Sequence, residues 1–69
     1  MKNFRLDIMV VILNDFFKKH MVEFNGLSPV ENWEIGMEEV EANGTEEMID
    51  MMNDIYERNL LDTVFKVQE

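Results

Sequence analysis

The sequence predicts an all-α fold, a small bundle of about three amphipathic helices with a short C-terminal tail. Apolar residues recur at steps of three and four along most of the chain, as they do on one face of a helix. Two Asn-Gly pairs, Asn25-Gly26 and Asn43-Gly44, interrupt this period, and a serine or threonine that can cap a helix follows each pair. The 69 residues, with no cysteine among them, therefore form one small domain without a disulfide.

The first helix is expected over residues 4–24. Its main apolar stripe comprises Leu6, Met9, Val10, Leu13, Phe17, His20, Met21 and Phe24, and Ile8, Val11, Ile12 and Phe16 widen it. Because one thin neighbour cannot cover so broad a stripe, we expect this helix to lie between two layers or against a partner. The β-branched run 8–13 would also suit a strand, but the helical period continues past it and favours a helix. Asn25-Gly26 is expected to end the helix.

The second helix is expected over residues 29–42. Ser28 and Glu31 form a capping box, and Pro29 fits the first helical position. The predicted inner stripe comprises Val30, Trp33, Met37 and Val40, with Glu34, Glu38, Glu39 and Glu41 largely outside it. Gly36 lowers helix stability by about 1 kcal/mol relative to alanine, so we expect a close packing contact there.

The third helix is expected over residues 46–58. Thr45 caps it, two acids follow at the positive end of the helix dipole, and Arg58 lies near the negative end. Its inner face comprises Met48, Met51, Met52 and Ile55. Residues 60–69 suit either another helical turn or an extended segment.

The net charge of −9 is unevenly distributed along the chain. Residues 1–24 are near neutral, whereas ten acids and no Lys or Arg occur between Glu31 and Glu57. Direct nucleic-acid binding is disfavoured, because phosphate affinity depends on cationic side chains. A basic protein partner suits this charge. The candidate partner surface comprises Glu38, Glu39, Glu41, Glu46, Glu47 and Asp50.

The sequence predicts no enzyme and no catalytic, cofactor or metal site. His20 is the single histidine and cannot build a zinc site without further imidazoles or thiolates, so we interpret it as a surface or core-edge residue. The carboxylate pairs lie on predicted solvated faces, whereas catalytic pairs need desolvation. The acids of 50–57 lack the mid-loop glycine of a calcium-binding loop.

Two features allow a binding or a structural interpretation. Met48, Met51 and Met52 could form an adaptable binding surface, but a filled core is favoured. Trp33 could stack on a sugar, but its place on the inner stripe favours an anchor for the second helix.

An ordered set of turn, aromatic and acidic residues follows the apolar run 8–19. In order it comprises Phe24, Gly26, Pro29, Trp33-Glu34, Gly44, Glu46-Glu47 and Tyr56-Glu57-Arg58. Over residues 6–58 this pattern resembles the C-terminal helices of extracellular, carbohydrate-type (family 1) solute-binding lipoproteins of ABC transporters. The turn before Pro29 is shorter than is usual in that family, and the tail after Asn59 has no counterpart there.

The resemblance implies a non-enzymatic helical module, a truncated or isolated C-terminal piece of a transport receptor. Such receptors enclose a sugar between two α/β lobes, so this chain alone is not expected to bind solute. Self-association through apolar helix faces would cover the stripe that a lobe covers in the receptor. The related receptors are exported, which implies an extracellular or cell-surface location for a chain that is part of one.

The alternative interpretation is an acidic inhibitor that mimics nucleic acid and blocks a basic groove on its partner. It explains the charge asymmetry but not the ordered set.

The apolar run 8–13 is shorter than that of a secretory signal, so a complete chain is expected in the cytoplasm. No membrane insertion is expected, because no apolar run approaches about twenty residues. The scarcity of Lys and Arg in 4–24 disfavours a membrane-surface helix.

Overall fold

The computed structural model describes residues 4–67, which form four helices and no strand. The helices are α1 (Leu6–Lys19), α2 (Pro29–Asn43), α3 (Glu46–Glu57) and α4 (Leu61–Val64). About 70% of residues 4–67 are helical, which confirms the all-α fold class. The strand considered for residues 8–13 is wrong, because this run lies inside α1.

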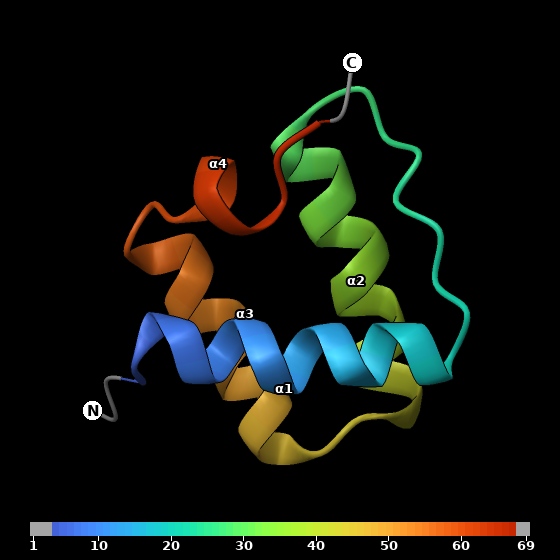
Figure 1. Ribbon diagram of the computed structural model, residues 1–69, viewed down its shortest axis with the longest axis vertical. Coiled ribbons are helices and arrows are strands. Elements are labelled where there is room, and N and C mark those ends of the chain that lie inside the picture. Colours follow the sequence, from blue (N-terminus) through green and yellow to red (C-terminus); the bar gives the residue numbers. More distant parts are fainter. Residues whose placement is uncertain (1–3, 68–69) are drawn as a thin grey trace.

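α1 lies across α2 and α3, which run in opposite directions behind it (Figure 1). The connector 20–28 leads along one side of the molecule from the end of α1 to the start of α2 (Figure 1). α4 packs against both α2 and α3. α2 and α3 are therefore antiparallel, and α1 crosses this pair.

One core draws side chains from every helix. Its ten buried apolar residues are Met9, Leu13, Phe16, Phe17, Val40, Met51, Met52, Ile55, Leu61 and Phe65. Met51 and Met52 are core residues, as expected, and Met48 packs half-buried at the edge. The radius of gyration, 11.0 Å, equals that of a compact domain of this length.

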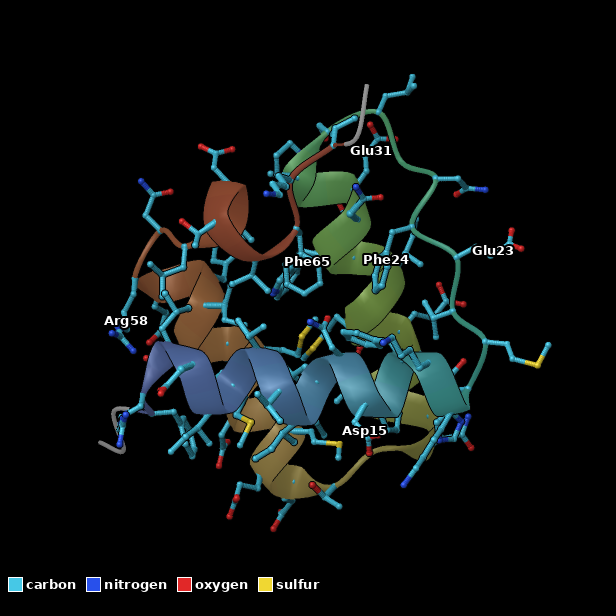
Figure 2. The ribbon with its side chains drawn as sticks, viewed as in Figure 1. Asp15, Glu23, Phe24, Glu31, Arg58 and Phe65 are labelled. Carbon is cyan, nitrogen blue, oxygen red and sulfur yellow. The ribbon has the colours of Figure 1, made fainter. Side chains whose placement is uncertain are left out.

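Gly36 lies where Phe17 of α1 contacts α2. A Cβ at this position would lie 2.9 Å from Cζ of Phe17 and 3.2 Å from Cε of Met52, so the expected packing contact is confirmed. The Phe17 ring is also the centre of an aromatic cluster, with ring centroids 4.9 Å from Phe24 and 6.2 Å from Phe65. Figure 2 shows the Phe24 and Phe65 side chains pointing toward one another. The connector and the tail thus both contact α1 at Phe17.

The predicted range of the first helix, 4–24, is wrong at its C-terminal end, because α1 stops at Lys19. Met21 adopts the left-handed conformation, with a φ of 53°. Its N–H donates to the Lys18 carbonyl at 3.2 Å, and the Val22 N–H donates to the Phe17 carbonyl at 3.0 Å. These two bonds form a Schellman motif, which ends the helix.

The connector residues assigned to the first helix do not continue its buried stripe. Met21 is 84% exposed and Phe24 is 38% exposed, although the Phe24 ring still packs on Phe17. Asn25-Gly26 does not end a helix. Instead, the Gly26 N–H donates to Oδ1 of the buried Asn32 at 2.8 Å, which ties the connector to α2.

The predicted starts of the second and third helices are confirmed, whereas the first helix begins at Leu6 instead of residue 4. Oγ of Ser28 accepts from the Glu31 N–H at 3.2 Å, and Oε1 of Glu31 accepts from the Leu27 N–H at 3.2 Å. Thr45 caps α3 by accepting from the Met48 N–H at 3.2 Å. The Glu31 and Met48 amides belong to first helical turns, which lack intrahelical partners for their N–H groups, and the Leu27 contact fixes the residue before the Ser28 cap.

The inner stripe predicted for the second helix is displaced around the helix axis. The buried residues of α2 are Asn32, Gly36 and Val40, spaced four residues apart. Trp33 and Met37 flank this line and are half-buried, while Val30 is exposed. The absence of a side chain at Gly36 allows this line to contact α1.

The tail forms the helical turn α4 rather than an extended segment. α3 ends at Glu57 in a second Schellman motif, in which Asn59 has a φ of 58° and the Leu60 N–H donates to the Ile55 carbonyl at 2.9 Å. Leu61 and Phe65 then enter the core. The part of this expectation that concerns residues 68–69 lies outside the described residues.

Replacing Met21 with glycine is expected to stabilise the protein by about 1 kcal/mol, because glycine adopts positive φ without a steric penalty. The exposed Met21 side chain contributes few contacts that this change would remove. Urea unfolding followed by circular dichroism measures the effect. Leu27→Gly is the matched control, because Leu27 is exposed in the same connector without a positive φ. A lower midpoint for Met21→Gly would contradict the assigned turn.

Candidate functional site

The candidate partner residues gather where α2 meets α3. Glu38, Glu39 and Glu41 lie on the last turns of α2, and Glu46, Glu47 and Asp50 lie on the first turns of α3. Only Gly44 and Thr45 separate the two helices, so both groups flank one bend of the chain. We call these six residues the acidic corner. Five of them are exposed to solvent, and Glu39 is half-buried.

Glu39 is engaged inside the protein. Its Oε2 accepts a hydrogen bond from Nδ2 of Asn43 and lies 3.4 Å from Nδ1 of His20. The His20 ring in turn packs on Phe16, with centroids 4.3 Å apart. His20 is therefore a core-edge residue, as expected, and Glu39 joins the end of α1 to α2 rather than pointing freely toward a partner.

Two open hollows lie along α2. The first, of about 310 Å³, lies between α2 and the connector; its lining residues are His20, Met21, Val22, Glu23, Ile35, Glu38, Glu39 and Ala42. The second, of about 430 Å³, is lined by Trp33, Glu34, Met37, Glu38 and Glu41, and we call it the α2 hollow. Glu38 lines both, so α2 carries carboxylates on the walls of each.

Trp33 anchors α2 to α3. Its Nε1–H donates to the Met52 carbonyl at 2.8 Å, and its ring lies 5.0 Å from that of Tyr56. The anchor interpretation of Trp33 therefore agrees with the structure. The sequence interpretation missed that the half-buried indole also lines the α2 hollow beside Met37 and three carboxylates. In the sequence, the alternation of these apolar and acidic residues along one side of the helix could have indicated the hollow.

The acids considered for calcium lie within α3 instead of a loop. Asp54 is buried, and its Oδ2 accepts from Nη1 of Arg58 at 2.9 Å. The same guanidinium nitrogen donates to the Phe4 carbonyl at 2.8 Å, beside the start of α1 (Figure 2). Arg58 therefore neutralises Asp54 and ties α3 to the N-terminal segment. Within residues 4–67, no cluster of three or more His, Cys, Asp or Glu could hold a metal ion.

The four helices described are also too short or too polar for any of them to cross a bilayer. The chain matches no protein-family model, no curated protein and no solved structure with which it was compared.

Replacing Arg58 with alanine is expected to destabilise the fold by about 2 kcal/mol, because the buried Asp54 carboxylate loses its partner. Arg5→Ala is the matched control. Its pair with Asp7 is solvent-exposed, so its loss should change stability by less than about 0.5 kcal/mol. Chemical denaturation compares the two variants, and equal effects would contradict the structural role of Arg58.

Proposed function

We propose that this chain is a non-enzymatic interaction module that binds a basic protein through the surface of α2 and α3. One observation carries the proposal: residues 29–57 hold ten carboxylates and no Lys or Arg. The basic side chain that follows them, Arg58, is already bonded to Asp54. The negative charge of this surface is thus largely unneutralised by the protein itself.

Such a surface favours a basic partner for two physical reasons. Opposite fields steer the two proteins together and raise the association rate. Carboxylates on neighbouring helix ends can also occupy a basic groove that otherwise binds nucleic acid, which is the inhibitor interpretation of the sequence. Because salt screens exposed charges over about 8 Å at physiological ionic strength, the interaction should weaken as salt rises.

Charge reversal at Glu38 and Glu46 is expected to weaken capture of a basic partner roughly tenfold, because both carboxylates lie on the acidic corner. A set of purified basic DNA-binding proteins, titrated calorimetrically at low and physiological salt, provides the measurement. Reversal of Asp7 and Asp15 on α1 is the matched control, with the same change in net charge and a smaller expected effect. Failure of every basic protein to bind, or binding that does not respond to salt, would reject the proposal.

A second proposal follows the resemblance to solute-binding lipoproteins: a receptor-derived helical module that associates with a second copy of itself. It is supported by the outer face of α1, where Ile8 is 43% exposed and Val11 is 68% exposed beside the half-buried Ile12. Residues 4–24 hold three basic and three acidic side chains, so two copies can meet at α1 with less repulsion than at the acidic corner.

Sedimentation is expected to show a dimer that dissociates on dilution and is lost in Val11→Lys, because a lysine on the outer face of α1 introduces a charge that pairing would bury. Glu57→Lys, on the exposed side of α3, is the control that should leave the dimer unchanged. A stable monomer with little dye-binding apolar surface would reject self-association. Neighbouring permease genes would support the receptor origin.

A further inference from the structure

The α2 hollow combines an apolar floor with an acidic rim. Trp33 and Met37, one helical turn apart, supply the floor. Glu34, Glu38 and Glu41 follow at steps of four and three, so their carboxylates form a row beside it. The acidic corner shares Glu38 and Glu41 with this hollow, but its other carboxylates do not line the hollow; these are Glu39, Glu46, Glu47 and Asp50.

The Trp33 indole of the floor is already positioned by contacts within the protein. The Trp33 N–H is bonded to the Met52 carbonyl, and the ring lies against Tyr56, so the indole is fixed on two sides. Its donor is satisfied, which leaves the ring as an apolar contact surface. Within residues 4–67, none of Glu34, Glu38 and Glu41 forms an ion pair. The rim therefore offers three carboxylates to a cation beside a fixed aromatic ring.

We infer that the α2 hollow binds an arginine side chain of the basic partner, and this inference rests on the proposed function. The planar guanidinium of arginine stacks on an indole face through a cation–π contact. Its N–H groups lie in the same plane and donate charge-assisted hydrogen bonds to carboxylates at the rim. The aliphatic stem packs on Met37. A lysine ammonium offers the charge without the flat surface, so it gains less from this site.

Trp33 is the single tryptophan, so its fluorescence reports on the hollow directly. The experiment titrates the chain with an arginine–glycine peptide and, separately, with a lysine–glycine peptide of equal length and charge. The first variant removes the rim charges by Glu34→Gln, Glu38→Gln and Glu41→Gln. The matched control removes the same number of charges by Glu46→Gln, Glu47→Gln and Asp50→Asn. Circular dichroism and urea unfolding verify that each variant is folded.

The arginine peptide is expected to change the indole emission and to bind more tightly than the lysine peptide. Loss of the rim charges should raise its Kd roughly tenfold, and the control should raise it less than about threefold. Equal losses in the two variants would overturn the inference while leaving a general acidic surface, and hence the proposed function, in place. Equal affinity for the two peptides would overturn the arginine assignment. If neither peptide nor any basic protein binds, both proposals fail.

Discussion

The contact between Phe17 and α2 at Gly36 is the constraint on which the rest of the structure depends. α1 can lie across α2 because no Cβ occupies the space taken by the Phe17 ring. Phe24 and Phe65 then pack on that ring, which fixes the connector and the tail on the side where α1 meets the core. A small chain without disulfides thus buries ten apolar side chains in one cluster. Overpacking such a contact typically costs about 1–3 kcal/mol.

Much of this fold could be predicted from local sequence rules. The caps at Ser28 and Thr45 and the close approach at Gly36 depend on nearby residue types, and all three appear in the structure. The end of α1 could not be predicted in this way. Met21 takes the left-handed conformation although Asn25-Gly26 is the better local stop signal. The turn at Met21 allows the Phe24 ring to pack on the Phe17 ring, and no local sequence pattern predicts this tertiary contact.

The candidate site was also only partly visible in the sequence. The acids of the corner were evident from composition, whereas the structure shows that only two residues separate the two helix ends. The α2 hollow was missed because Trp33 and Met37 were assigned to a buried stripe, whereas the buried line follows Asn32, Gly36 and Val40. The displacement leaves the indole half-exposed beside the glutamates. Because Gly36 has no side chain, the backbone of α2 contacts α1 there, and the larger side chains of Trp33 and Met37 lie to the side of this contact.

α1 packs across α2 at Gly36, and this packing leaves the acidic surface of α2 and α3 on the part of the molecule that α1 does not cover. Proton nuclear Overhauser spectroscopy tests this packing directly. The account predicts strong cross peaks between the Phe17 ring protons and the Gly36 α protons, together with peaks from the Phe17 ring to Phe24 and Phe65. A folded, helical protein that shows none of these peaks would contradict it.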